Sequence, residues 1–243
     1  MTIRRTHSRL ASLALATAAA TAMPLVSAHN VGQDGAHPPI IPNNAVVYGN
    51  SMGEWSARWV QWFLSIPAAT NPANDTTGAS CAEGQSGPVW FLAGTSGINY
   101  PVTRACTVPA GKPMFIPILN TFFGAGVFDC EPTVPGTQCN LATLRASAAA
   151  AMDPVTLRAE MDGKRLTRLE SQRITTPAYT ITYPEGSVTG VASGSYSPNV
   201  ADGYWLMVAP PKKGSHTLLI KGDITGGPFV GSSVDVTYNL TIQ

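Results

Sequence analysis

The sequence predicts a mainly β protein: a β-sandwich, immunoglobulin-like or jelly-roll in arrangement, with one or two helices packed on it. Short apolar or alternating segments recur along the chain and are separated by turn residues. The chain holds 23 Gly and 20 Pro in 243 residues, and only 12% of its residues are charged, about half of the usual share. With 44% hydrophobic residues, the composition excludes a disordered chain.

The clearest helix is expected from residue 52 to 65, where apolar residues recur at helical spacing. Ser51 and Glu54 have the spacing of a capping box, and Pro67 ends the segment. We expect this helix to pack across a sheet through its apolar side. If its tryptophans (Trp55, Trp59 and Trp62) instead lined an open groove with a polar rim, ligand binding would be favoured.

The strands are expected in short, turn-bounded segments, and an Ala-rich second helix is expected at residues 141–152. Asp162-Gly163 predicts a tight hairpin, and Asp202-Gly203 is interpreted as a turn. The expected strands are residues 46–48, 89–93, 104–108, 114–119, 155–161, 164–169, 179–183, 203–208, 215–221 and 233–242.

Residues 1–28 have the order of a secretory signal peptide. Three arginines (Arg4, Arg5 and Arg9) precede an uncharged apolar stretch, which ends in the small residues Ser27 and Ala28. Pro24 and many Ala and Thr distinguish the stretch from a membrane span. We therefore expect a secreted or periplasmic protein whose residues 29–243 form a single β-sandwich domain, with an N-terminal arm and no transmembrane segment.

Removal of residues 1–28 takes away three of the 15 basic residues and none of the 14 acidic ones, which leaves a net charge of −2. This balance gives no reason to expect nucleic acid as a partner. A polysaccharide or a component of the cell envelope is the partner class that we expect.

All four cysteines (Cys81, Cys106, Cys130 and Cys139) follow the signal segment. An even number in an oxidising compartment predicts two disulfides, for which three pairings are possible. We favour Cys81–Cys106 and Cys130–Cys139, because each pair closes a loop rich in turn residues. A metal site is disfavoured, because the cysteines form no CxxC pair and have no nearby histidine.

Several sequence motifs are distinctive. Residues 53–62 read GEWSARWVQW, residues 87–94 read GPVWFLAG, residues 106–112 read CTVPAGK and residues 202–205 read DGYW. Together they resemble a group of exported bacterial proteins of unassigned function. The resemblance implies export and one mostly β unit, and it carries over no catalytic residues.

Two constellations would make the protein an extracellular enzyme. Residues 49–53 match G-x-S-x-G between a short strand and a helix, so Ser51, Asp202 and His216 give the order of a hydrolase triad. The competing interpretation of Ser51 is that of a helix cap. A glycosidase would instead draw two carboxylates from a larger set: Glu54, Asp129, Glu131, Asp202 and Asp235.

The second constellation is a copper site. Cleavage after Ala28 would place His29 at the N-terminus, where its amine and imidazole chelate copper and a second histidine, His216 or His37, completes three nitrogens. Such an arrangement resembles that of secreted copper polysaccharide monooxygenases. The alternative interpretation is that His216 is a surface or core histidine whose hydrogen-bonding groups already have partners.

Binding without catalysis is the function that we favour. Tyr196, Tyr204, Trp90 and Trp205 would stack on sugar rings if they faced solvent. The apolar surroundings of Trp90 and Trp205 favour a core position instead. The sequence thus predicts a non-catalytic binding or envelope-associated protein, with the copper enzyme or the Ser51 hydrolase as the alternative.

Overall fold

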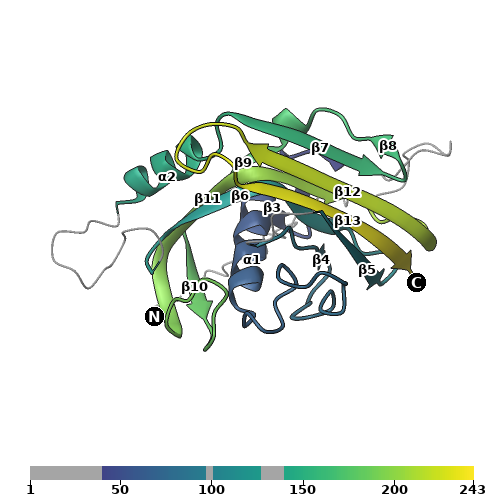
Figure 1. Cartoon of the computed structure of the whole chain (residues 1–243), viewed down its shortest axis with the longest axis horizontal. Coiled ribbons are helices and arrows are strands. Elements are labelled where there is room, and N and C mark those ends of the chain that lie inside the picture. The colour runs from purple at the N-terminus through teal and green to yellow at the C-terminus, as the bar shows by residue number, and fades with distance from the viewer. Residues whose placement is uncertain (1–39, 97–100, 127–139) are drawn as a thin grey trace, which may run out of the picture. The chain divides into compact units, whose positions relative to one another are not determined.

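The computed structural model describes residues 40–96, 101–126 and 140–243, which all belong to one compact unit, Ala36–Gln243 (Figure 1). The expected signal peptide, His29, His37 and the Cys130–Cys139 pair lie outside the described residues. Among the residues that the structure describes, no helix is both long and apolar enough to cross a membrane.

The first sheet has six strands, and its longest strand, β11, organises it. β11 pairs antiparallel with β6 on one side and with β10, β9 and β1 on the other, while β4 runs parallel to β6. The strands are β1 (Ile40–Ile41), β4 (Trp90–Phe91), β6 (Met114–Gly124), β9 (Arg173–Thr175), β10 (Tyr179–Tyr183) and β11 (Gly194–Val208).

The second sheet has five strands, and its order places the last strand of the chain beside β5. β5 is parallel to β13, and the other pairs are antiparallel. The order is β5 (Val102–Val108), β13 (Ser233–Ile242), β12 (Gly214–Ile224), β7 (Val155–Met161) and β8 (Lys164–Arg165). A separate hairpin joins β2 (Val46–Val47) to β3 (Asn50–Ser51).

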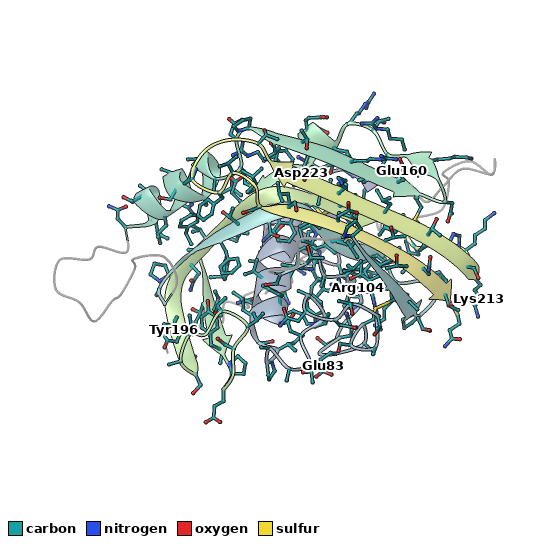
Figure 2. The ribbon with its side chains drawn as sticks, in the orientation of Figure 1. Glu83, Arg104, Glu160, Tyr196, Lys213 and Asp223 are labelled. Carbon is teal, nitrogen blue, oxygen red and sulfur yellow. A yellow bond between two sulfur atoms is a disulfide. The ribbon has the colours of Figure 1, made fainter. Side chains whose placement is uncertain are left out.

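The two sheets pack face to face, which confirms the predicted β-sandwich. Ile116 and Leu206 of the first sheet belong to the same buried cluster as Leu218 and Val236 of the second. Strand β5 alternates buried and exposed residues along its whole length, as a strand with one covered face does. The outer face of the second sheet carries charged side chains, among them Glu160 and Asp223 (Figure 2).

Helix α1 (Met52–Leu64) covers the other face of the first sheet (Figure 1). The indole of Trp59 meets that of Trp205 edge-on at 5.2 Å, and Trp205 stacks on Phe115 at 5.6 Å. Ser51 and Glu54 form the predicted capping box. Nine buried residues on a 13-residue helix explain why it forms a core layer of its own.

Helix α2 (Leu141–Ala150) packs beside one end of β11, where Leu144 and Ala148 are buried with Phe123 and Val200. A short 3₁₀ helix, η1 (Leu169–Gln172), follows β8 and takes the place of the strand expected to continue to residue 169.

The turn expected at Asp202-Gly203 is wrong, because both residues lie inside β11. A Cβ on Gly203 would stand 2.5 Å from the carbonyl oxygen of Leu119, so glycine here permits close strand approach. The carboxylate of Asp202 is held by Arg173 Nε at 2.8 Å and Thr175 Oγ1 at 2.6 Å. These two contacts satisfy the buried carboxylate of Asp202, and they explain how an aspartate that the sequence pattern predicts in a turn can lie inside a strand.

Candidate ligand-binding cleft

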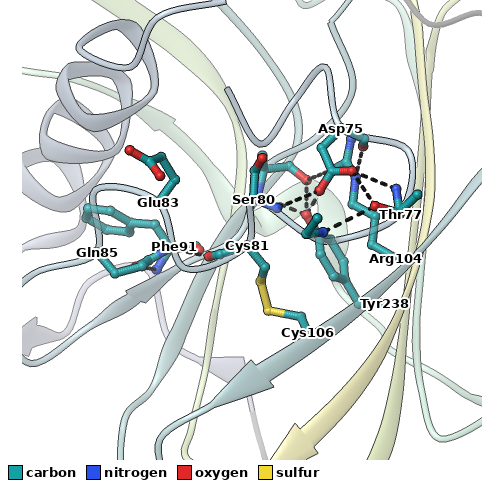
Figure 3. The surroundings of a disulfide bond; sticks show 12 residues. Asp75, Thr77, Ser80, Cys81, Glu83, Gln85, Phe91, Arg104, Cys106 and Tyr238 are labelled. Atoms are coloured by element: carbon teal, nitrogen blue, oxygen red, sulfur yellow. Dashed lines mark hydrogen bonds between the residues drawn. A yellow bond between two sulfur atoms is a disulfide. The ribbon is translucent and has the colours of Figure 1, made fainter. Parts of the chain in front are cut away.

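Residues 67–89 form a long segment without helix or strand that follows α1, and a disulfide fixes it to the sandwich. Cys81 in this segment is bonded to Cys106 of β5, with a Cα–Cα distance of 5.7 Å (Figure 3). This confirms the predicted pairing. Closing a loop of this length stabilises the folded chain by about 3 kcal/mol, chiefly by restricting the unfolded state.

Asp75 organises the segment from within. Its carboxylate accepts hydrogen bonds from the backbone N–H of Thr77 at 2.7 Å and of Ser80 at 2.9 Å, and from the hydroxyl of Thr77 (Figure 3). Burial alone would raise the pKa of Asp75, but these hydrogen bonds outweigh it and lower that pKa. The folded segment therefore favours the ionised carboxylate.

Arg104 of β5 ties the segment to the second sheet. Its side chain is 1% exposed and donates hydrogen bonds to four backbone carbonyls and to the hydroxyl of Tyr238 at 2.9 Å (Figure 3). The carbonyls are those of Ala73, Asp75, Ala93 and Gly94. A buried guanidinium surrounded by acceptors holds these backbone positions in one arrangement.

With the segment fixed, α1, residues 84–88 and β10 enclose a cleft of about 390 Å³. That volume lies in the usual range of small-molecule sites. The floor is aromatic and the rim carries hydroxyl, amide and guanidinium groups. The lining residues are Trp55, Arg58, Gln61, Trp62, Ser65, Gly84, Ser86, Gly87, Pro88, Phe91, Thr180 and Thr182.

The two indoles of the floor are held in place by their ring N–H groups. Trp55 Nε1 donates to the carbonyl of Val47 at 2.9 Å, and Trp62 Nε1 donates to that of Glu83 at 3.0 Å. They are 5% and 7% exposed, so they present a narrow apolar surface. Gly84 lies close against the second ring, since a Cβ there would stand 3.1 Å from Trp62 Nε1.

The rim is linked to both walls. Gln61 donates through Nε2 to the carbonyl of Thr180 at 2.9 Å, which joins α1 to β10. The guanidinium of Arg58 lies 5.6 Å from the centre of the Trp55 ring, within the range of a cation–π contact. Arg58 is the one charged residue that lines the cleft among the described residues.

Ser51, Asp202 and His216 are not brought together as a triad. The Ser51 hydroxyl donates to Glu54 Oε2 at 2.8 Å, within the helix cap, while Asp202 is bound by Arg173 and Thr175. The hydrogen bonds that Glu54 accepts from the backbone N–H and the hydroxyl of Ser51 lower its pKa, and the nearby charge of Arg58 acts in the same direction. No hydrogen bond among the described residues joins any two members of the proposed triad.

His216 is satisfied within its own surroundings. Its Nδ1 lies 2.9 Å from Asp162 Oδ2, and its Nε2 lies 2.9 Å from the carbonyl oxygen of Lys212. Both partners are hydrogen-bond acceptors, so both ring nitrogens are occupied by these contacts and neither is free to bind copper. Within the described ranges, no three His, Cys, Asp or Glu side chains gather as metal ligands would. The copper hypothesis at His29 stays a prediction.

The aromatic residues expected to stack on sugars mostly belong to the core. Trp205 is fully buried, Trp90 is 6% exposed and Tyr204 is 8% exposed, while Tyr196 is half-buried. The condition that these four face solvent therefore fails for three of them, because their strands are covered on both faces. Of the helix tryptophans, Trp55 and Trp62 line the cleft and Trp59 does not.

Sequence reasoning missed the rim of the cleft. Arg58 and Ser65 follow Trp55 and Trp62 at helical spacing. This spacing predicts a stripe of polar and aromatic residues along α1, which is the sequence pattern that could have indicated the cleft. Ser86, Thr180 and Thr182 come from distant segments, and no local pattern marks them.

Compared with protein-family models, with curated proteins and with solved structures, this chain finds no match.

Proposed function

We propose that this chain is a secreted, non-catalytic carbohydrate-binding protein whose ligand is a sugar held in the cleft between α1 and β10. The observation that carries the proposal is the pairing of an aromatic floor with a polar rim in one cleft. The apolar C–H faces of a sugar pack on indole and phenyl surfaces, while its hydroxyls need hydrogen-bonding partners.

The rim offers such partners around the floor. Arg58 and Gln61 present guanidinium and amide N–H groups, and Ser86 and Thr182 present hydroxyls that both donate and accept. Because the disulfide, Arg104 and the indole hydrogen bonds fix the walls, little ordering accompanies binding. Such preorganisation raises affinity.

Binding fits the lining better than hydrolysis. No carboxylate lines the cleft among the described residues, whereas glycosidases place two carboxylates beside the scissile bond. Glu54, Asp202 and Asp235 each have another partner: the helix cap, Arg173 and Lys221.

Export is supported by the signal-peptide order of residues 1–28 and by the resemblance of residues 53–62 to exported bacterial proteins. The Cys81–Cys106 disulfide suits an oxidising compartment. A polysaccharide of the envelope or surroundings is then within reach of the cleft.

A blocking substitution tests the proposal. Ser86 is an exposed rim residue, so Ser86→Trp fills the cleft without altering the core. We expect the exported chain to be retained on insoluble cellulose or chitin, and Ser86→Trp to lower its affinity about tenfold or more by steric exclusion.

The matched control is Ser215→Trp, the same change at an exposed residue of β12. It should bind as the wild type does. Absence of retention on every neutral polysaccharide tried, or equal retention of both variants, would contradict the proposal.

A further inference from the structure

A second concave site lies where an edge of the first sheet comes close to an edge of the second. A groove of about 490 Å³ is lined by residues of the edge strands β1 and β8, by the residues that follow each of them, and by η1. Asn43 Nδ2 donates to the carbonyl of Ser171, and the backbone N–H of Leu166 donates to Ala159 at 2.8 Å. Leu169 is buried beneath. The backbone walls of the groove are therefore fixed to the sandwich.

Three cations line this groove: Lys164, Arg165 and Arg168. All three are exposed, and none has a side-chain hydrogen bond or ion pair with another described residue. No carboxylate lines the groove among the described residues. The lining of the groove therefore carries a net positive charge within a concave surface, where it raises the local concentration of anions.

Two of the acidic residues nearest the groove cations along the chain, Glu160 and Asp162, are bound elsewhere. Glu160 stands opposite Arg165 in the strand register, yet its carboxylate is 2.7 Å from Arg158. Asp162 accepts from the backbone N–H of Thr217 at 2.8 Å and pairs with His216. Glu160 and Asp162 are thus occupied by partners on the second sheet, whereas Glu170 of η1 is exposed but does not line the groove, so the lining itself keeps an excess of positive charge.

We propose that this groove is a binding site for an anionic glycan, a saccharide chain whose sugars carry carboxylates or phosphates. Arginine's planar guanidinium matches these oxyanions with two parallel hydrogen bonds, and lysine adds a point charge. The remaining lining suits the rest of a sugar: hydroxyl and amide groups at Asn43, Thr167 and Ser171, and apolar surface at Pro42 and Leu166.

The lining also separates this ligand from nucleic acid. Single-stranded nucleic acids bind by stacking their bases on aromatic side chains, and no aromatic residue lines the groove among the described residues. The groove shares no lining residue with the aromatic cleft. The two sites can therefore be tested separately, and failure of one leaves the other standing.

The test is calorimetric titration of the exported chain with hexagalacturonate, with a phosphomannan fragment and with neutral maltohexaose. We expect binding of at least one anionic glycan that exceeds that of maltohexaose and weakens as salt rises, because exposed charges are screened. The double variant Arg165→Gln/Arg168→Gln should lower that affinity about tenfold or more, with an unchanged melting temperature.

The charge-matched control is Arg145→Gln/Lys213→Gln, which removes two exposed cations outside the groove (Lys213 is labelled in Figure 2). It should retain wild-type affinity. The proposal is overturned if the anionic glycans bind no better than maltohexaose or if both double variants weaken binding equally. It is also overturned if the groove cations bind only RNA or vesicles of anionic lipid.

Discussion

The aromatic cleft and the cationic groove differ in which of their parts are held rigid. In the cleft, the side chains themselves are fixed: two indoles are hydrogen-bonded to backbone carbonyls, and the wall is held by a disulfide and a buried arginine. In the groove, the backbone is fixed, and the three cationic side chains are exposed and form no hydrogen bond or ion pair with another residue that the structure describes. We propose that the first surface selects its ligand by shape and the second by charge.

This contrast predicts that damage to the core network affects one site only. Arg104→Met removes the buried donor that bonds four carbonyls and the Tyr238 hydroxyl at once. We expect a loss of about 3–5 kcal/mol in the free energy of unfolding, measured by urea denaturation. Polysaccharide retention should be lost while the groove still binds its anion below the midpoint of unfolding.

Arg145→Met, at an exposed position of α2, is the control and should change the free energy of unfolding by less than about 0.5 kcal/mol. Equal stability of the two variants would show that the guanidinium of Arg104 does not hold residues 73–94.

A smaller effect is expected at the contact between the wall and the indole. Gly84 and Gly87 both have positive φ, 61° and 70°, but only a Cβ at Gly84 would crowd Trp62. Gly84→Ala and Gly87→Ala should each lose about 1 kcal/mol from backbone strain. Only Gly84→Ala should also shift the tryptophan fluorescence, because Trp62 must move. Identical spectra for the two variants would contradict the close packing described for the cleft.

The smallest effect on the free energy of unfolding is expected at His216. Burial lowers the pKa of His216, but its hydrogen bonds with Asp162 and Lys212 outweigh burial and raise that pKa above 6.5. Folding therefore favours protonated His216, so its contribution to stability is complete below about pH 6.5. That contribution disappears as the pH rises through the folded-state pKa.

The measurement is the free energy of unfolding of the wild type and His216→Gln at several pH values. The difference between them should be largest below about pH 6.5 and shrink at higher pH. A difference that grows with pH would mean that His216 is held in its neutral form. Retention on neutral polysaccharide should be the same for both proteins, because His216 does not line the cleft.

Local patterns predicted the elements whose stability is local. The capping box at Ser51 and Glu54, the helix that follows, the Cys81–Cys106 pair and the Asp162-Gly163 hairpin all appear as expected. In the hairpin, both turn residues have positive φ, which is the conformation that an Asp-Gly pair favours.

Tertiary contacts decided what the patterns missed. β11 extends through Pro198 and Asp202-Gly203, which resemble strand breakers, because Arg173 and Thr175 satisfy the aspartate and β6 approaches the glycine. Both concave sites combine residues separated by more than a hundred positions, such as Arg58 with Thr180 and Asn43 with Arg168. Periodicity within one segment carries no information about such pairs.

The bond between Cys81 and Cys106 has a consequence for where the protein works. In a reducing cytoplasm the two thiols remain unbonded. The wall that carries Glu83 and Gly84 against Trp62 then loses its covalent anchor. A newly made chain would thus be poorly equipped to capture cytoplasmic sugars. It would gain full affinity only after oxidation, which would couple maturation of the proposed binding cleft to the redox state of its surroundings.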